Sequence, residues 1–247
     1  MNEKIINELI QKIELLGVEV IKDIPEFEKD KSPSLSGKAL FTIMPADADE
    51  LSEALKILFE KKITLFARGG GTGVTGGAVP FDGVVVSFAK MNRIVEVDDK
   101  NMTITVEPGV VTAEINKAVS SKKLFYPPDP ASLNECTIGG NAAVSAGGPH
   151  AVKYGTTKDY ILGMEFITVD GTKMHWGAKT VKNSAGFSLG QLIVGSEGTL
   201  AFVTKLILKL VPVPQFSCDI LASFDSIESA VSCVNKILLG RISPAAL

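Results

Sequence analysis

The segment that most constrains the fold is a glycine-rich loop at residues 68–77, Arg-Gly-Gly-Gly-Thr-Gly-Val-Thr-Gly-Gly, which directly follows an apolar run at residues 63–67. Because glycine has no Cβ, such a loop can take positive φ angles and turn several amide N–H groups towards one ligand. Arg68 adds a permanent positive charge at the edge of the loop. We therefore interpret the loop as a cradle for a pyrophosphate.

Three other interpretations of this loop compete. Gly71, Gly73 and Gly76 match the spacing of a dinucleotide-binding turn, but that pattern is informative only before a helix, and Pro80, Gly83 and a β-branched run follow here. A nucleoside-triphosphate loop ends in Gly-Lys-Ser/Thr, which this loop lacks. A flexible linker is polar on both sides, whereas this loop lies between two apolar segments that are typical of strands.

The composition is that of a globular protein. The chain has 247 residues, 45% of them hydrophobic, and a formal net charge of -3, so it can form one large or two small domains. This balance favours neither nucleic acid nor an anionic membrane as a partner. The longest apolar candidate, residues 200–213, is interrupted by Lys205 and Lys209, so we expect no transmembrane segment. The first residues lack a signal-peptide pattern, and we expect a cytoplasmic protein.

Cysteine and histidine give no metal signature. Cys136, Cys218 and Cys233 are odd in number and show no Cys-x-x-Cys spacing, which argues against a disulfide framework and a zinc or iron–sulfur site. His150 and His175 are the only histidines, and neither has a partner at helical spacing. We interpret both as surface or packed residues and expect no metal site.

The first part of the chain predicts helices and a small α/β unit. Asn2 caps a helix with apolar residues at the helical period, which ends at Gly17. Residues 22–38 are charged and contain prolines, which indicates an irregular connection. Pro45 opens a second helix with an apolar face of Leu51, Ala54, Leu55, Leu58 and Phe59. With the strands that flank the glycine loop, this helix forms the unit over residues 41–97.

Two hairpins are expected in the second part. Residues 93–97 and 102–106 alternate around a polar turn, and residues 165–169 and 172–176 flank Asp-Gly. Residues 200–211 alternate leucine with lysine, which predicts another strand.

Between the hairpins lie segments of small and rigid residues. Thr112 caps a further helix, and residues 127–130, Pro-Pro-Asp-Pro, form a turn that no helix or central strand accommodates. Residues 137–141 and 145–148 are rich in glycine, alanine and serine, which lets a flat ligand approach the backbone.

The end of the chain looks like part of another domain. Pro212 and Pro214 mark a boundary, beyond which we expect a strand at residues 220–224 and a helix at residues 227–239. A strand and a helix bury no core alone, so we expect this domain to be incomplete.

This ordered set of motifs resembles the FAD-binding half of the vanillyl-alcohol oxidase and p-cresol methylhydroxylase flavoproteins. The closest branch is that of the glycolate oxidase flavoprotein subunit and D-lactate dehydrogenase. The resemblance extends over residues 41–213, and its motifs are residues 68–73, 127–130, 136–141, 146–148, 153–155, 181–183 and 194–200.

The resemblance implies an α+β, two-lobed FAD-binding domain of the p-cresol methylhydroxylase type over residues 41–213. A small α/β lobe would span residues 41–97, and a larger, mostly antiparallel lobe would span residues 102–213, with FAD between them. Residues 1–40 would be an amino-terminal helix and connection. Residues 214–247 would begin an incomplete substrate or cap domain.

The resemblance also implies which residues bind FAD. Some family members attach the flavin through a histidine in the first glycine loop, and since this loop has none, we expect noncovalent FAD. The loop would hold the pyrophosphate, the two small-residue segments would line the ribityl and isoalloxazine region, and residues 197–198 would lie nearer the adenosine. The implied cofactor residues are Arg68, Gly69, Gly70, Gly71, Thr72, Gly73, Gly76, Pro128, Asp129, Thr137, Gly139, Gly140, Asn141, Ser145, Gly147, Gly148, Tyr154, Gly155, Glu197 and Gly198.

The implied function is that of a D-2-hydroxyacid dehydrogenase acting on D-lactate or glycolate, which transfers a hydride to FAD and then electrons to an iron–sulfur or electron-transfer flavoprotein partner. No catalytic base is identified in this chain, and a homodimer is one possible assembly. Three alternatives stay open: an oxygen-using oxidase of the same family, a noncatalytic FAD-binding module of a split enzyme that needs a partner cap chain, and an NADPH-dependent reductase of an enolpyruvyl sugar nucleotide. Phe187, Ser188 and Ala201 depart from residues common in the family and weaken any assignment of substrate.

Overall fold

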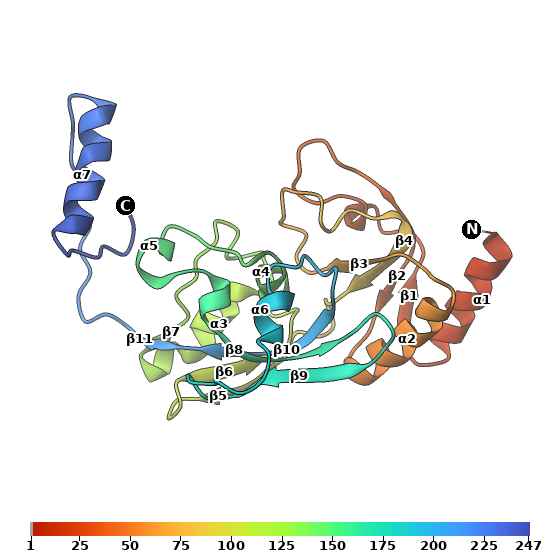
Figure 1. The fold of residues 1–247 in the computed structure, drawn as a ribbon. Helices are drawn as coiled ribbons and strands as arrows, with labels where there is room; N and C mark the ends of the chain where they lie inside the picture. Colours follow the sequence, from red (N-terminus) through yellow and green to blue (C-terminus); the bar gives the residue numbers. More distant parts are fainter. Residues whose placement is uncertain (1) are drawn as a thin grey trace.

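Asn2 begins the first helix of the computed structural model, which describes residues 2–247 (Figure 1). Its side chain accepts a hydrogen bond from the amide of Lys4 at 3.1 Å, and helix α1 spans Glu3–Glu14. The apolar stripe of α1 is buried at Leu9, Ile10 and Ile13. The predicted first helix, which ends before Gly17, is therefore confirmed.

The small lobe is built on a four-stranded sheet of order β1-β2-β4-β3. Its strands are β1 (Glu19–Ile21), β2 (Lys38–Met44), β3 (Leu65–Arg68) and β4 (Phe81–Ser87). Strands β2, β4 and β3 are parallel, and β1 is antiparallel to β2. Parallel neighbours need a long connection, usually a helix. Between β3 and β4 the glycine loop makes this crossover without a helix.

Helix α2 (Ala48–Glu60) connects β2 to β3 in the small lobe. It begins later than predicted, because Asp47 and not Pro45 provides the cap: the Asp47 carboxylate accepts the amides of Asp49 at 2.8 Å and Glu50 at 2.9 Å. The predicted apolar face is buried except for Phe59, which is 49% exposed. That prediction was wrong because Phe59 lies at the edge of the buried stripe.

The large lobe contains a five-stranded antiparallel sheet of order β5-β6-β10-β8-β9. Its strands are β5 (Ile94–Asp98), β6 (Thr103–Val106), β8 (Ile161–Ile167), β9 (Lys173–Gly177) and β10 (Phe202–Lys209). Both predicted hairpins are present, as β5–β6 and β8–β9. Alternate residues of β10 are buried, as the leucine and lysine alternation predicted.

Short helices pack against this sheet, namely α3 (Thr112–Val119), α4 (Ile138–Val144) and α6 (Leu189–Ile193), and a further short helix is α5 (Ala151–Tyr154). A two-stranded pair joins β7 (Leu124–Phe125) to β11 (Val211–Pro212). Single 3₁₀ turns occur at η1 (Pro25–Phe27), η2 (Ser120–Lys122) and η3 (Thr157–Asp159). Val111 is the N-cap residue of α3, so Thr112 is its first helical residue and not the predicted cap.

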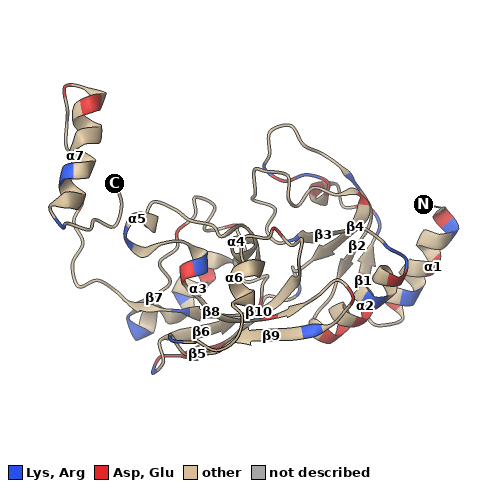
Figure 2. Cartoon of the chain, viewed as in Figure 1, with Lys and Arg blue, Asp and Glu red and all other residues tan. Residues whose placement is uncertain are grey.

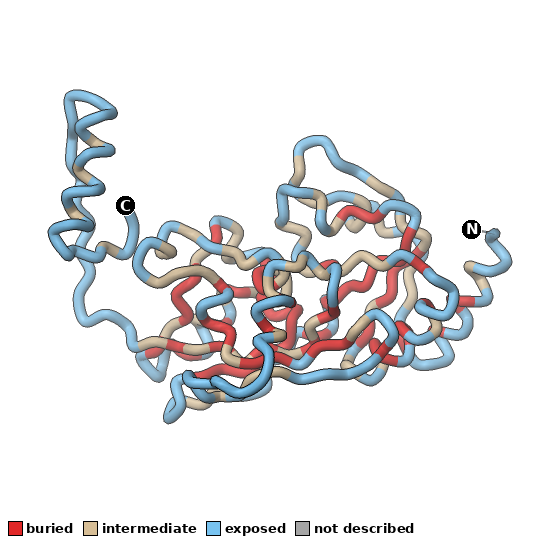
Figure 3. Tube along the Cα trace, viewed as in Figure 1, coloured by how far each residue is buried: buried red, intermediate tan, exposed pale blue. Residues whose placement is uncertain are grey.

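Each lobe has its own hydrophobic core, and Figure 3 shows buried segments in both lobes. The small-lobe core also includes Ile167 and Phe202 from strands of the large lobe, and the rings of Phe88 and Phe202 lie 6.4 Å apart. The Ser52 hydroxyl of α2 donates a hydrogen bond to the Gly171 carbonyl in the β8–β9 turn at 2.7 Å. The α+β, two-lobed architecture that the sequence predicted is thus confirmed, with the lobes in contact along one side.

The last residues lie apart from the two lobes. Helix α7 (Ile227–Leu239) has the predicted bounds, and none of its residues is buried (Figures 1 and 3). The predicted strand at residues 220–224 is absent, because no described strand lies beside this segment to pair with it. Apolar side chains therefore stay exposed here, including Phe216, Ile220 and Leu221.

Charges of both signs are mixed over the helices of the protein, as Figure 2 shows for α1, α2, α3 and α7. Within residues 2–247, no helix combines the length and the apolar character that a membrane crossing requires.

Candidate cofactor site

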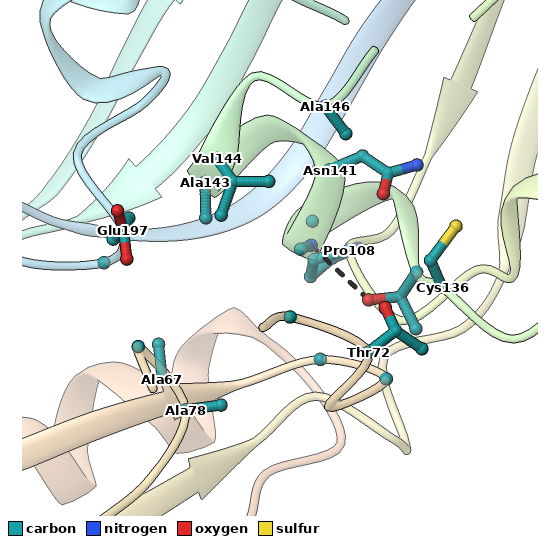
Figure 4. A pocket seen from close by; sticks show the side chains of 18 of the residues that line it. Ala67, Thr72, Ala78, Pro108, Cys136, Asn141, Ala143, Val144, Ala146 and Glu197 are labelled. Atoms are coloured by element: carbon teal, nitrogen blue, oxygen red, sulfur yellow. Dashed lines mark hydrogen bonds between the residues drawn. The ribbon is translucent and has the colours of Figure 1, made fainter. Parts of the chain in front are cut away.

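An open cavity of about 200 Å³ lies between the two lobes (Figure 4). Most of its wall comes from three segments: the glycine loop, the segment that enters and forms α4, and the turn before β10. In Figure 4, Ala67 and Ala78 of the small lobe face Ala143 and Val144 of α4, and Glu197 lies at one end. The cavity is therefore formed where the lobes meet and belongs to neither core.

The structure brings many of the predicted site residues together in this cavity. They come from all three walls and are Gly69, Gly70, Gly71, Thr72, Gly73, Thr137, Gly139, Gly140, Asn141, Glu197 and Gly198. Residues that are far apart in sequence thus converge on one space.

The glycine loop offers backbone donors to this space. Within residues 2–247, no group accepts a hydrogen bond from the amides of Gly70, Gly71, Thr72 and Gly73. Gly70 and Gly73 are exposed and Gly71 and Thr72 are half-buried, so these four amides are open to water or to a ligand. The loop can therefore bind an anion through its backbone.

The first glycines also allow the lobes to approach closely. A Cβ on Gly69 would lie 2.3 Å from Thr137 Oγ1, and a Cβ on Gly70 would lie 2.5 Å from the Glu135 carbonyl oxygen. Both distances are far shorter than a van der Waals contact. Glycine at these positions therefore permits the contact between the loop and the start of α4.

The start of α4 contributes shape to the cavity more than hydrogen-bond donors. Its first amides are already paired: Ile138 donates to the Val110 carbonyl at 2.9 Å, and Gly139 donates to the Pro108 carbonyl at 2.8 Å. Thr137 Oγ1 accepts the amide of Gly140 at 3.4 Å, shown by the dashed line in Figure 4. The glycine loop therefore offers more free donors than the start of α4.

Asn141 anchors α4 from inside. Its side-chain nitrogen donates to Thr112 Oγ1 at 2.7 Å, and that hydroxyl donates to the Cys136 carbonyl at 3.2 Å. All three residues are buried. Asn141 thus lines the cavity while its amide group holds α4 against α3.

The turn before β10 closes the third side. The Glu197 amide donates to the Ala143 carbonyl at 2.8 Å, and the Gly195 amide donates to the Ala142 carbonyl at 3.0 Å. Glu197 adopts a left-handed backbone with a φ of 53°. A Cβ on Gly77 would lie 2.7 Å from the Glu197 carboxylate, which shows how closely this carboxylate approaches the small lobe.

Comparison with known proteins identifies the family. Residues 39–177 match the family described as "FAD binding domain". The chain belongs to this family of FAD-binding domains. This FAD-binding domain is 42% identical over 222 residues to the glycolate oxidase subunit GlcD of Bacillus subtilis (strain 168), covering 90% of this chain and 47% of that relative. It is 38% identical over 225 residues to a D-lactate dehydrogenase of Archaeoglobus fulgidus, covering 89% of this chain and 50% of that relative.

Solved structures share the fold of this FAD-binding domain. Alkyldihydroxyacetonephosphate synthase superimposes with a TM-score of 0.82 at 21% identity, over 97% of this chain and 47% of that one. p-Cresol methylhydroxylase gives a TM-score of 0.82 at 19% identity, over 96% of this chain and 49% of that one. The chain spans about half the length of the relatives it matches.

The residues of the cavity fit FAD. FAD carries a diphosphate between its adenosine and flavin parts, and the free amides of residues 70–73 are donors that a diphosphate can use. The charged residues among the described lining residues are Asp30 and Glu197, both acids. Direct contacts of a diphosphate with this wall would therefore be to backbone amides and not to a cationic side chain.

Arg68 is not among the cavity-lining residues, but its guanidinium lies behind the loop: a Cβ on Gly71 would lie 2.3 Å from Arg68 Nη2. Its guanidinium donates to the carbonyl oxygens of Glu26 at 2.8 Å and Lys29 at 2.9 Å, and it is only 6% exposed. It also lies 4.7 Å above the ring of Phe27. Burial lowers the pKa of Arg68, against the opposing effect of Asp30 and Glu26. No sequence pattern indicated these partners, since they lie some forty residues earlier in an irregular segment.

The amide of Gly76 is also taken by the protein. It donates to the Asp30 carboxylate at 2.9 Å, so it is not one of the free donors. The loop turns at this residue, where φ is 83°.

The remaining predicted residues lie outside the cavity and form a second group. They are Pro128, Asp129, Ser145, Gly147, Gly148, Tyr154 and Gly155. Asp129 accepts the His150 amide and its Nδ1, each at 3.1 Å, and a Cβ on Gly148 would lie 2.0 Å from the Asp129 carbonyl oxygen. The ring of Tyr154 packs edge-on against Phe125 at 5.6 Å. Ala146 lines the cavity between Ser145 and Gly147 in sequence, so the two groups are adjacent along the chain.

Sequence reasoning missed several lining residues, including Asp30, Ala67, Ala78, Pro108, Cys136, Val144 and Ser196. Cys136 directly precedes the motif that begins at Thr137, so the set of predicted site residues could have been extended by one residue to include it. Asp30 follows no motif, and only the fold brings it to the glycine loop.

Proposed function

We propose that this FAD-binding domain holds FAD noncovalently between its lobes and forms the flavin-binding half of an oxidoreductase for small 2-hydroxy acids, such as glycolate or D-lactate. The observation that carries the proposal is the run of free amides at residues 70–73, opposite the small residues of α4. The names of the relatives, a glycolate oxidase subunit and a D-lactate dehydrogenase, support the substrate class.

Each wall of the cavity has a separate role in this proposal. The amides of residues 70–73 bind the diphosphate, and Glu197 accepts hydrogen bonds from ribose hydroxyls of the adenosine part. Gly139 and Gly140 let the cofactor approach the α4 backbone. The group that contains Asp129 and Gly148 surrounds the ring end, beyond Ala146. Noncovalent binding is proposed because the loop at residues 68–77 has no histidine.

FAD, when bound, supplies the hydride acceptor for oxidation of the substrate carbinol carbon. The group that removes the hydroxyl proton is proposed to lie outside this chain, as is the electron acceptor, an iron–sulfur or electron-transfer flavoprotein. An oxygen-using oxidase remains the alternative for the second half-reaction.

A noncatalytic module of a split enzyme is the second candidate. Phe216 is 90% and Leu221 is 101% exposed, and α7 buries none of its residues, which favours packing of this segment against other polypeptide. We propose that residues 41–213 form the FAD-binding domain and that residues 214–247 belong to a second domain.

The cofactor proposal is tested by purifying the protein, recording its visible spectrum, and identifying and counting the flavin released on denaturation. The expected result is about one FAD per chain, released without proteolysis. Added FAD that fails to bind would contradict the proposal.

Anaerobic addition of glycolate or D-lactate to the loaded protein then tests the substrate class. Because the group that removes the hydroxyl proton is proposed to lie outside this chain, we expect bleaching of the flavin only after the second half of the protein is supplied. Bleaching by this chain alone would refute that placement of the base and the noncatalytic module, and no bleaching in either case would contradict the substrate class.

A further inference from the structure

Residues 26–37, which we call the strap, lie beside the glycine loop at the top of the small lobe in Figure 1. The strap contacts the loop at three points. The Lys31 amide donates to the Gly73 carbonyl at 2.9 Å, the Gly76 amide donates to Asp30 at 2.9 Å, and the Leu35 side chain packs at the position where a Gly76 Cβ would lie. The conformation of the loop is therefore coupled to the strap.

Arg68 anchors the strap where the loop begins. It is the last residue of β3, and its guanidinium bonds the carbonyls of Glu26 and Lys29 while stacking over Phe27. Charge-assisted bonds of a buried guanidinium are strong, so this end of the strap is fixed to the sheet. Arg68 thus acts on the loop through the strap.

The strap also reaches the large lobe. Lys31 Nζ lies 2.5 Å from the Glu135 carboxylate, and the Glu135 carbonyl oxygen is the atom that a Cβ on Gly70 would meet. Both side chains are more than half exposed, so this pair adds little stability. It nevertheless fixes the strap at the same place where the loop touches the segment before α4.

Asp30 is the unexpected member of this arrangement, because it brings a negative charge to a cavity proposed to bind a diphosphate. Its two oxygens accept separate amides, Ser32 at 2.8 Å and Gly76 at 2.9 Å. Burial raises the pKa of Asp30, but the hydrogen bonds from Ser32 and Gly76 outweigh burial, so the pKa is below its ordinary value. The negative charge of Asp30 repels an anion in the cavity. Its two hydrogen bonds indicate that the residue compensates for this repulsion by fixing the conformation of the loop.

We propose that Asp30 is a positioning residue for the cofactor, which holds the left-handed turn at Gly76 and so keeps the amides of residues 70–73 available for the diphosphate. This inference rests on the proposed function of the cavity. In the same arrangement Arg68 is a positioning residue too and makes no direct contact with the phosphates.

The substitution Asp30→Asn distinguishes this role from simple electrostatics, because the two predict opposite signs. Loss of a negative charge near the diphosphate would by itself tighten FAD binding. Asparagine, however, has one acceptor oxygen and an NH₂ group, so it can accept only one of the two amides. We expect FAD to bind about tenfold more weakly, which is the effect of losing one charge-assisted hydrogen bond.

The measurements are the FAD dissociation constant and the hydrogen exchange of the two amides that are hydrogen-bonded in this turn, those of Gly76 and Val79, in the protein without cofactor. Asp23→Asn is the matched control, since Asp23 is an exposed acid before the strap and makes no side-chain hydrogen bond within residues 2–247. Leu35→Ala, at a residue that is 41% exposed, loosens the same turn without changing charge. Exchange of core amides in α2 verifies that each variant is folded.

Faster exchange at Gly76 and Val79 in Asp30→Asn and Leu35→Ala, with weaker FAD binding in both and no change in Asp23→Asn, supports the proposal. Unchanged or tighter FAD binding in Asp30→Asn overturns it. Unchanged exchange in Asp30→Asn also overturns the proposal. If the unaltered protein binds no FAD, the proposed function fails, but the exchange comparison still decides whether Asp30 holds the loop.

Discussion

The contact between Gly69 and Thr137 offers a direct test of how the two lobes form the cavity. A Cβ on Gly69 would lie 2.3 Å from Thr137 Oγ1, and the next atoms, the N and Cα of Gly140, lie at the ordinary contact distances of 3.4 and 3.5 Å. Gly69 is not among the residues with positive φ, so alanine there meets a steric problem and no backbone problem. The clash thus depends on a single side-chain atom.

We expect Gly69→Ala to lower the free energy of unfolding by about 1–3 kcal/mol, as overpacking in a tight contact does. Thr137→Ala alone should cost about 0.5–1 kcal/mol, at the low end for an N-cap, because the bond from the Gly140 amide to Thr137 Oγ1 is long at 3.4 Å. In the double variant the obstructing oxygen is gone, so the Gly69→Ala substitution should cost only a few tenths of a kcal/mol. The predicted coupling is therefore about 1–3 kcal/mol.

The assay is urea unfolding of the four proteins of this cycle, repeated as FAD titrations because both residues line the cavity. The coupling should appear in stability and in FAD affinity with the same sign. If Gly69→Ala costs as much in the Thr137→Ala background as in the unaltered protein, the two side chains do not meet, and the cavity geometry derived from this contact is wrong.

Two further predictions concern single side chains. Asn141→Ala should lower the free energy of unfolding by about 1–3 kcal/mol, since it removes the close donor of the buried Thr112 hydroxyl and leaves only the Cys136 thiol at 3.4 Å. Asn134→Ala, at an exposed residue, is the control, and equal losses in urea unfolding would contradict the assignment. Hydrogen bonds from the side chain and amide of Asn101 lower the pKa of Asp98 to about 2. Because the folded pKa is below the unfolded one, the stability from Asp98 is present above the unfolded pKa of about 3.9 and is lost as pH falls towards 2. Asp98→Asn should flatten the stability profile in that window, and an unchanged slope between these pH values would refute it.

Periodicity and turn residues were sufficient to predict most elements. The two hairpins, α1, α7 and the strands around the glycine loop follow from local patterns that the packing of each lobe preserves. The prediction of a strand at residues 220–224 was wrong, because a strand depends on a partner strand that its own residues cannot specify. The predicted burial of Phe59 was wrong for a related reason, since only the packing of the helix decides where its apolar stripe ends.

The parts of the candidate site that depend on backbone shape could be predicted from the sequence. The parts that depend on side chains from distant segments could not. Few residues other than glycine allow a loop to turn several free amides towards one ligand. The part of the site at residues 69–73 could therefore be predicted from the sequence. The direction of Arg68 depends on carbonyls of Glu26 and Lys29, and the position of Asp30 depends on how the strap crosses the loop. Neither segment has a motif, because a carbonyl acceptor can come from any residue.

The location of the cavity follows from the connection between β3 and β4. These strands are parallel neighbours, so the chain must leave the end of β3 and return to the start of β4, and it does so through glycines without a helix. No helical bonds use the amides of this crossover, which is why residues 70–73 keep free donors. A helix would have paired these amides and covered the same end of the sheet. The absence of a crossover helix therefore provides both the donors and the space into which α4 of the large lobe fits.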